Sequence, residues 1–154
     1  MLNKITEKNE IIGRLLQLYL HDISLYFSMD MDQDTGLYIY DGLEDYLKDS
    51  GEKIAYLIKF ENNIAGFILV DFTNEKNIIQ EMFVLNNFKR KGVGSKAVTE
   101  LFDSHKGNWE IKSLPLSEQA ESFWTNIAKI YTNNNFNIEH IGKYNRAVIS
   151  FNNE

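Results

Sequence analysis

The chain has 154 residues, a length that suits one hydrophobic core, and we expect a single domain over residues 1–154. Its net charge of −6 argues against non-specific binding of nucleic acid, which needs a basic face. The absence of cysteine excludes disulfides, thiolate nucleophiles and cysteine-based zinc sites. No apolar run approaches the roughly 20 residues that cross a bilayer, and "MLNKITEKNEIIGRL" lacks a signal-peptide core, so we expect a cytoplasmic protein.

The spacing of apolar residues predicts seven strands and four helices. Between Asn9 and about Phe27, apolar residues recur every three or four positions, as one face of a helix requires. Gly51 is placed to end the second helix, and Ser117 is placed to cap the fourth. In chain order, the predicted elements are a strand at 2–6, helices at 9–27 and 43–51, strands at 53–60, 63–72 and 77–85, a helix at 93–105, a strand at 108–114, a helix at 117–132, and strands at 136–142 and 145–151.

The middle of this order contains a β–α–β unit. The strands at 77–85 and 108–114 are joined by a helix, so they should be parallel, with a right-handed crossover. The hairpins on either side of this unit should be antiparallel. The predicted fold class is therefore α/β (α+β): a mixed, mostly antiparallel sheet with a central parallel β–α–β unit and helices on both faces.

The stretch "FKRKGVGSKA", from Phe88 to Ala97, places three consecutive cations before two glycines at the start of a predicted helix. A helix N-terminus presents unpaired N–H groups and the positive end of the helix dipole. Glycines let a ligand approach that backbone closely, so the stretch predicts a site for a phosphorylated ligand. Two other interpretations stay open. One is a solvated basic loop, and the other is a Gly-x-Gly-x-x-Ala dinucleotide fingerprint, whose glycines usually turn directly off a strand.

The element order and the segment "EMFVLNNFKRKGVGSKAVTELF" resemble the GNAT superfamily of N-acetyltransferases, and the resemblance covers nearly the whole chain. The family's loop is usually written Gln/Arg-x-x-Gly-x-Gly/Ala. Gly92 and Gly94 match this loop, and Lys89 fills its first position. The pattern is also similar to a branch of small bacterial predicted acetyltransferases. The resemblance implies the GNAT fold and acetyl-CoA as co-substrate, with no metal.

The resemblance also implies where acetyl-CoA would bind. The N–H groups of the loop and the helix start would hold its pyrophosphate, and the basic side chains would add charge. The pantetheine arm would pair with the backbone of the fourth strand, which in the family bulges and separates from the fifth. Trp124 would pack against the arm, and Ser117 stands where an Asn often contacts it. The expected cofactor-binding residues are Phe83, Val84, Leu85, Lys89, Arg90, Lys91, Gly92, Val93, Gly94, Ser95, Lys96, Ser117 and Trp124.

Glu81 is the candidate general base, because it is a carboxylate on an otherwise apolar strand. The family often has a Glu at this point, and burial would raise its pKa and suit it to proton removal. A capped or exposed strand-edge Glu is the structural alternative. By the resemblance, the N–H of Val84 would polarise the thioester carbonyl. Trp124 stands where many members have a Tyr that acts as general acid, and its indole cannot take that part, so Tyr131 or water would replace it.

The acidic loop "SMDMDQDTGLYIYDG" joins the first two predicted helices, and in GNAT folds this segment borders the acceptor site. We expect its carboxylates, chiefly Asp30 and Asp32, to attract a cationic amine, and Tyr26 to form a wall of the site. A solvated acidic loop stays open as an alternative. The part "DMDQDTG" also resembles the start of a calcium loop, but Asp41 stands where such a loop has its bidentate Glu.

These features together predict an acetyl-CoA-dependent N-acetyltransferase that acts on a primary amine of a cationic small molecule or peptide. The alternative function is a non-catalytic module that binds acyl-CoA and has a regulatory role. Such a module would keep the glycine loop and lack a working base. We expect neither nucleic acid nor a membrane as partner, and the sequence leaves a homodimer open.

Overall fold

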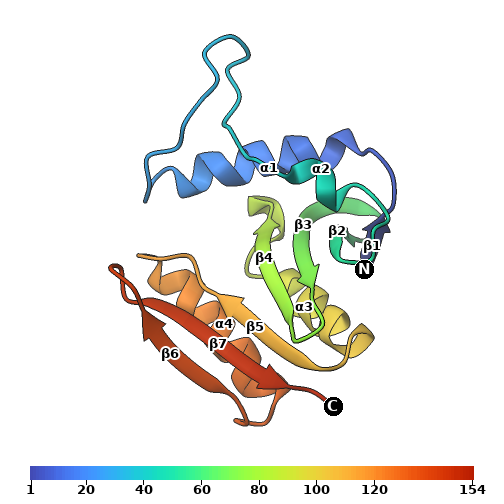
Figure 1. The fold of residues 1–154 in the computed structure, drawn as a ribbon. Helices are drawn as coiled ribbons and strands as arrows, with labels where there is room; N and C mark the ends of the chain where they lie inside the picture. The colour runs from blue at the N-terminus through green and yellow to red at the C-terminus, as the bar shows by residue number, and fades with distance from the viewer.

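The computed structural model describes residues 1–154, which form a seven-stranded sheet and four helices (Figure 1). The elements are β1 (Leu2–Ile5), α1 (Glu10–Ile23), α2 (Leu43–Tyr46), β2 (Lys53–Phe60), β3 (Asn63–Phe72), β4 (Asn77–Val84), a 3₁₀ turn (Asn86–Phe88), α3 (Val93–Ser104), β5 (Asn108–Lys112), α4 (Glu118–Tyr131), β6 (Asn137–Ile141) and β7 (Arg146–Asn152). The strand order is β1-β2-β3-β4-β5-β7-β6, and only β4 and β5 are parallel. The predicted fold class is confirmed.

The helices cover both faces of the sheet, and each face has its own hydrophobic cluster. On the first face, which we call the α1 face, Leu16 of α1 belongs to one cluster with Phe67 and Leu69 of β3. On the opposite face, which we call the α3/α4 face, Leu101 of α3 belongs to a second cluster with Trp109 of β5. Because successive side chains of a strand point to opposite faces, the face of each strand residue follows from its position in the strand.

None of the helices is both long enough and apolar enough to cross a membrane.

Both N-terminal helices, α1 and α2, are shorter than predicted. The helix α1 ends at Ile23, because the N–H groups of Tyr26 and Phe27 turn back onto the Ile23 carbonyl at 2.9 and 3.2 Å. Phe27 instead packs against Tyr144 in the β6–β7 turn, with ring centroids 6.0 Å apart. The helix α2 is a single turn, and its last residue, Tyr46, donates a hydrogen bond to Asp71 at 2.5 Å.

Strand β4 contains a one-residue bulge at Gln80. Val70 of β3 lies opposite Ile79, whereas the preceding residue, Leu69, lies opposite Glu81, so Gln80 has no partner in the register. Strand β5 pairs with β4 only from Asn77 to Ile79. Beyond the bulge the two strands diverge, as Figure 1 shows. The bulge therefore leaves the end of β4 paired on one side only, and it turns the side chain of Glu81 to the α1 face.

Gly66 of β3 allows β3 and the end of β4 to lie close together. A Cβ at this position would come within 1.9 Å of the Phe83 carbonyl oxygen, a backbone atom that cannot rotate away. We expect Gly66→Ala to lower the free energy of unfolding by about 1–3 kcal/mol in urea titrations. The matched control is Gly13→Ala in α1, where a Cβ would lie 3.9 Å from Leu43, and which should raise stability by about 0.5–1 kcal/mol. Equal stability of Gly66→Ala and the wild type would contradict this strand spacing.

Candidate active site

The N-terminus of α3 has no side-chain cap, in contrast to the other two long helices. Asn9 caps α1 by accepting the Ile11 N–H at 2.9 Å. Ser117 caps α4 by accepting the Ala120 N–H at 3.2 Å, which confirms the predicted cap at this residue. At α3 the cap position is Gly92, with a φ of 73° that favours glycine and no side-chain hydrogen bond. The first N–H groups of α3 have no partner within the helix, so they and the helix dipole are available to an anion.

A cavity of about 440 Å³ opens beside this helix end, between β4 and the first turns of α3 and α4. One part of its lining is apolar and comes from Met82, Val84 and Trp124, among others. Another part is cationic and polar and includes Arg90 and Gly92. The cavity therefore suits a ligand with an anionic group and a longer uncharged arm. The complete lining is Met82, Val84, Phe88, Lys89, Arg90, Gly92, Gly94, Ser95, Ser117, Gln119, Ala120, Phe123 and Trp124.

The structure separates the expected cofactor-binding residues into two groups. Eight of them line the cavity, namely Val84, Lys89, Arg90, Gly92, Gly94, Ser95, Ser117 and Trp124. The other five do not line it. The side chains of Lys91 and Lys96 are exposed, Val93 is buried in the α3/α4 cluster, and Phe83 and Leu85 pack on the α1 face.

The hydrogen bonds of β4 determine which of its backbone groups are free to pair with a ligand. The N–H of Leu85 donates to the Ala65 carbonyl at 2.8 Å, so Leu85 faces β3. Because hydrogen-bonded and non-hydrogen-bonded pairs alternate along an antiparallel ladder, Phe83 also faces β3, while Met82 and Val84 face the side that β5 has left. The backbone groups available to an added strand are therefore those of Met82 and Val84. The backbone groups of Phe83 and Leu85 pair with β3, so this geometry does not support the prediction that they bind the arm, because the sequence alone does not determine which backbone groups of β4 face β3.

The three cations of the loop point in different directions. Lys89 leans toward the α1 face, where its ammonium group lies 3.9 Å from Asp22 and 5.9 Å from the ring centre of Phe83. Arg90 lines the cavity and has a φ of 61°, an uncommon value for a residue with a side chain. Lys91 is exposed and lies outside the cavity lining. Arg90 is therefore the cation of the loop that is best placed to meet an anion in the cavity.

Glu81 lies half-buried on the α1 face, where two tyrosines donate hydrogen bonds to its carboxylate. The Tyr19 hydroxyl of α1 is 2.5 Å from one oxygen, and the Tyr40 hydroxyl is 3.4 Å from the other. Burial raises the pKa of Glu81 above its ordinary value, and the two hydroxyls and the Arg146 guanidinium partly oppose this rise. The result is a carboxylate with a raised pKa, held beside the point where β4 and β5 diverge.

The comparisons with known proteins agree with this geometry. Residues 15–127 match the model of the acetyltransferase (GNAT) family. The chain belongs to the GNAT family. No curated protein matches its sequence.

Solved structures with the same fold cover nearly the whole GNAT chain. A Bacillus subtilis acetyltransferase in complex with CoA has a TM-score of 0.63 and 15% identity, over 99% of this chain and 98% of that chain. A GNAT acetyltransferase from Elizabethkingia anophelis with acetyl-CoA bound has a TM-score of 0.59 and 15% identity, over 99% and 97%. A GNAT-family acetyltransferase described as putative, from Bacteroides thetaiotaomicron, has a TM-score of 0.62 and 14% identity, over 100% and 88%. At these identities the likeness shows the fold alone.

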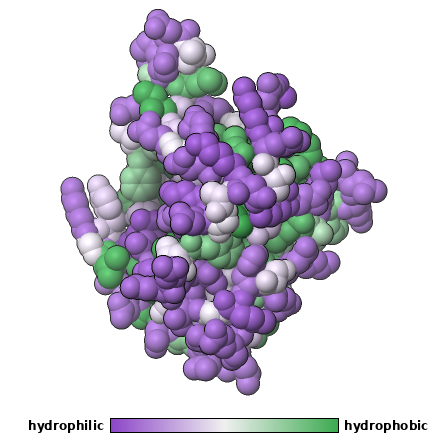
Figure 2. Space-filling model, turned by 45° about the vertical axis from the view of Figure 1, so that its right-hand side comes forward, coloured by the Kyte–Doolittle hydropathy of each residue, from purple (hydrophilic) through white to green (hydrophobic).

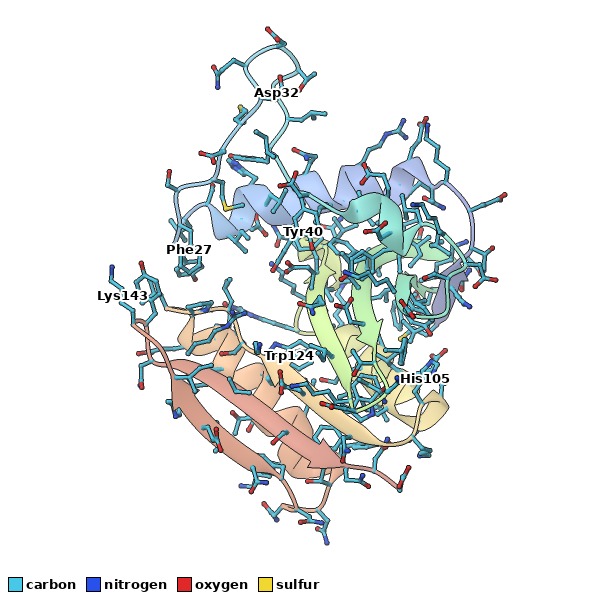
Figure 3. All side chains as sticks on the ribbon, in the orientation of Figure 1. Phe27, Asp32, Tyr40, His105, Trp124 and Lys143 are labelled. Carbon is cyan, nitrogen blue, oxygen red and sulfur yellow. The ribbon has the colours of Figure 1, made fainter.

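The acidic loop of this GNAT chain holds Asp32 on the far side of α1 from the cavity-lining Trp124. The loop projects from the body, as Figure 2 shows, and in Figure 3 Asp32 lies at its tip, on the far side of α1 from Trp124. Asp32 accepts the N–H groups of Asp34 and Thr35 at 2.9 and 3.0 Å, and these bonds lower its pKa. Asp30 and Tyr26 are exposed nearer the base of the loop. The contacts of Asp32 therefore give it a local structural role, which is to hold the turn.

Trp124 and Tyr131, the two residues weighed for the place of the general acid, lie in different surroundings. Trp124 lines the cavity and packs edge-to-face on Phe123, with ring centroids 4.9 Å apart. Tyr131 lies outside the cavity lining, at the other end of α4, and donates to Asp103 at 2.9 Å. Tyr131 is therefore badly placed to give a proton to a group in the cavity.

The sequence reasoning missed three residues around Glu81, namely Tyr19, Tyr40 and Arg146. Tyr19 lies on the apolar face of the predicted helix at 9–27, and Tyr40 lies in the acidic loop, so neither position in the sequence indicates a contact with Glu81. One signal was available, because a carboxylate on an apolar strand needs hydroxyl or amide donors, and tyrosine can bring a hydroxyl to an apolar face. Burial and the nearby Glu81 raise the pKa of both Tyr19 and Tyr40 well above the ordinary value, so both stay neutral donors.

The Tyr19–Glu81 contact predicts a change in titration. A donor to a carboxylate stabilises the charged form, so its removal in Tyr19→Phe should raise the pKa of Glu81. The measurement is the pH dependence of the Glu81 side-chain carboxyl signal in ¹³C NMR. The control is Tyr38→Phe, whose hydroxyl contacts His21 at 2.9 Å and not Glu81. A Glu81 pKa that is unchanged or lower in Tyr19→Phe would contradict the contact.

Proposed function

We propose that this GNAT protein is an N-acetyltransferase that moves an acetyl group from acetyl-CoA to a primary amine. One observation carries the proposal. Two features lie on opposite faces of the sheet near the point where β4 and β5 diverge. The α3/α4 face has the cavity and the uncapped N-terminus of α3, and the α1 face has Glu81, a carboxylate whose pKa is raised. The two faces are thus equipped for different molecules, an anionic acyl donor on one and a proton-bearing acceptor on the other.

The lining of the cavity fits acetyl-CoA. We assign the pyrophosphate to the free N–H groups at the start of α3 and to Arg90. We assign the uncharged arm to the unpaired backbone of Met82 and Val84, with Trp124 packed beside it. When bound, acetyl-CoA supplies an acetyl group that is already activated as a thioester. Ser117 lines the cavity, and its hydroxyl oxygen caps α4, so its O–H group would still be free to donate a hydrogen bond to the arm.

The proposed chemistry requires a base, since a protonated amine has no lone pair with which to attack. An amine with the ordinary pKa of a lysine, about 10, is neutral in only about one molecule in a thousand at pH 7. Glu81 would take that proton, directly or through one water, with Tyr19 and Tyr40 holding its carboxylate in place. The N–H of Val84 faces away from β3, and we propose that it would polarise the carbonyl oxygen of the thioester.

The charge of the acceptor is not part of this proposal. The expectation of a cationic amine depended on the acidic loop, and the contacts of Asp32 give no support to it. The competing function, a non-catalytic module that binds acyl-CoA, keeps the cavity and lacks acetyl transfer. Release of free CoA thiol on addition of a panel of amines distinguishes the two, since only the transferase releases thiol in an amine-dependent way.

The cavity lining predicts unequal roles for two neighbouring cations. We expect Arg90→Gln to weaken CoA binding about tenfold, because Arg90 lines the cavity and would contact phosphate. The matched control is Lys91→Gln, which removes the same charge outside the lining and should have a smaller effect. The measurement is isothermal titration calorimetry with CoA at low and high salt, since added salt should weaken the wild-type affinity. Equal losses in both variants would contradict the role of Arg90.

The protonation of Glu81 predicts a pH-dependent loss of activity. Glu81→Gln keeps the shape of the side chain and removes its basicity, so kcat/KM should fall by roughly 10²–10⁴ at pH 7. The loss should shrink as pH rises, because the free amine becomes abundant, and the affinity for CoA should stay constant. In the wild type, kcat/KM should fall on acidification at a pH above the ordinary range of a carboxyl, because the pKa of Glu81 is raised.

The matched control for this variant is Glu139→Gln, an exposed carboxylate on β6. It makes the same chemical change away from Tyr19 and Tyr40, and it should leave the pH profile as it is. Wild-type activity of Glu81→Gln at pH 7 would show that Glu81 is structural and that the proton leaves by another route.

A further inference from the structure

Arg146, the first residue of β7, is a half-buried cation without an acidic partner. None of the ion pairs of the chain includes it, although Lys53 of β2 and Lys112 of β5 each have a carboxylate within 4 Å. A charge that is withdrawn from water normally has a partner of opposite charge, because the loss of hydration is costly. The unpaired guanidinium therefore suggests that its partner is a ligand.

The register of the sheet places Arg146 on the same face as Glu81. Residues two apart in a strand share a face, so Arg146 lies on the face of Val148, and Val148 is opposite Lys112 of β5. Lys112 shares its face with Glu110, two residues earlier, and Glu110 is opposite Ile78 of β4. Residues directly opposite one another share a face, so this series of residues lies on the α1 face, to which the bulge also turns Glu81. Arg146 and Glu81 thus stand on the α1 face from the two sides of the strand divergence.

Two backbone carbonyls fix the guanidinium at the end of β5. Its Nε donates to the Ser113 carbonyl at 2.7 Å, and its Nη2 lies 3.4 Å from the Lys112 carbonyl. These contacts occupy one edge of the group and leave three of its five N–H donors, including the pair at its end. A carboxylate accepts such a pair of donors in parallel. Glu81 does not fill this place, because the side-chain hydrogen bonds of Arg146 go only to these two carbonyls, while the carboxylate of Glu81 accepts from Tyr19 and Tyr40.

We propose that Arg146 binds the carboxylate of the acceptor, and that the acceptor is a small amino carboxylate, such as a free amino acid, which receives the acetyl group on its amino nitrogen. The proposal rests on the proposed function for the transfer itself. It assigns opposite ends of the acceptor to two charged groups: the amine lies toward Glu81, which takes its proton, and the carboxylate lies toward Arg146. An attractive field from Arg146 on Glu81 supports their proximity, since the cation lowers the pKa of that carboxyl.

The test is a binding measurement that does not require turnover. The probes are the twenty L-amino acids, β-alanine and γ-aminobutyrate, screened by thermal shift in the presence of CoA. The best binder is then compared with its own carboxamide by calorimetry. We expect the acid to bind about 10- to 100-fold more tightly than the amide, which has the same amine and no negative charge. Failure of every probe to bind, or equal affinity of acid and amide, overturns the proposal.

Variants then locate the effect. Arg146→Gln should remove the preference for the acid over the amide and leave the affinity for CoA unchanged. Arg146→Lys should keep a part of the preference, because lysine retains the charge and loses the paired donors. The control is Lys112→Gln, which removes a cation from the same face and should keep the preference. A preference that persists in Arg146→Gln overturns the proposal. If Arg146→Gln does not fold, Arg146→Lys and the acid–amide comparison on the wild type still give the answer.

Thiol release separates this inference from the function on which it rests. If the acid binds through Arg146 and no thiol is released from acetyl-CoA, the carboxylate-binding role of Arg146 holds and the transferase function fails. If amines without a carboxylate are acetylated as well as the amino acids, the transferase function holds and the inference fails.

Discussion

The whole arrangement depends on one extra residue in β4. Without the bulge at Gln80, strict alternation would turn Glu81 to the α3/α4 face, in line with Ile79 and away from Tyr19. With the bulge, Glu81 points to the α1 face while Met82 and Val84 point toward the cavity. The same irregularity ends the pairing with β5, which frees one edge of the β4 backbone. A single backbone irregularity thus determines the position of the carboxylate and frees the strand edge.

The second constraint is electrostatic and concerns which helix ends are capped. A side-chain cap satisfies the first N–H groups of a helix, and α1 and α4 both have one. The helix α3 has a glycine in the left-handed region at this position, so its N–H groups and its dipole stay available where the cavity opens. The missing cap costs α3 local stability, and the packing of its buried face, with Val98 and Phe102 fully covered, offsets that cost. The buried face of α3 thus supplies stability, while its N-terminal end keeps backbone N–H groups without partners.

Much of the fold was predictable from the sequence, because its signals are local. The strands β2 and β3 have the predicted bounds, since continuous apolar runs are limited by polar turn residues on both sides. The predicted end of α1 at Phe27 was wrong, because Phe27 continues the apolar spacing of the helix although its ring packs on Tyr144, a residue far away in the sequence. The glycine loop and Glu81 could be found, since glycines and an isolated carboxylate are visible in one dimension. The family resemblance implied a bulge in β4 and a role for Val84. The position of the bulge at Gln80, the outward-facing backbone of Met82 and the two tyrosines that reach Glu81 depend on register and on packing between distant segments, which the sequence does not determine.

The charges around Glu81 have a consequence for what this site can accept. A carboxylate that is to act as a base must stay available to a proton, so it cannot be bound tightly to a cation. The structure meets this condition by giving Glu81 two neutral donors, Tyr19 and Tyr40, and by keeping Arg146 beyond ion-pair distance. Burial then raises the pKa of Glu81, and the hydroxyls and the guanidinium limit the rise, so that Glu81 is a stronger base than an exposed carboxylate. The guanidinium that is kept from Glu81 is, for the same reason, free to meet a negative charge that arrives with the acceptor.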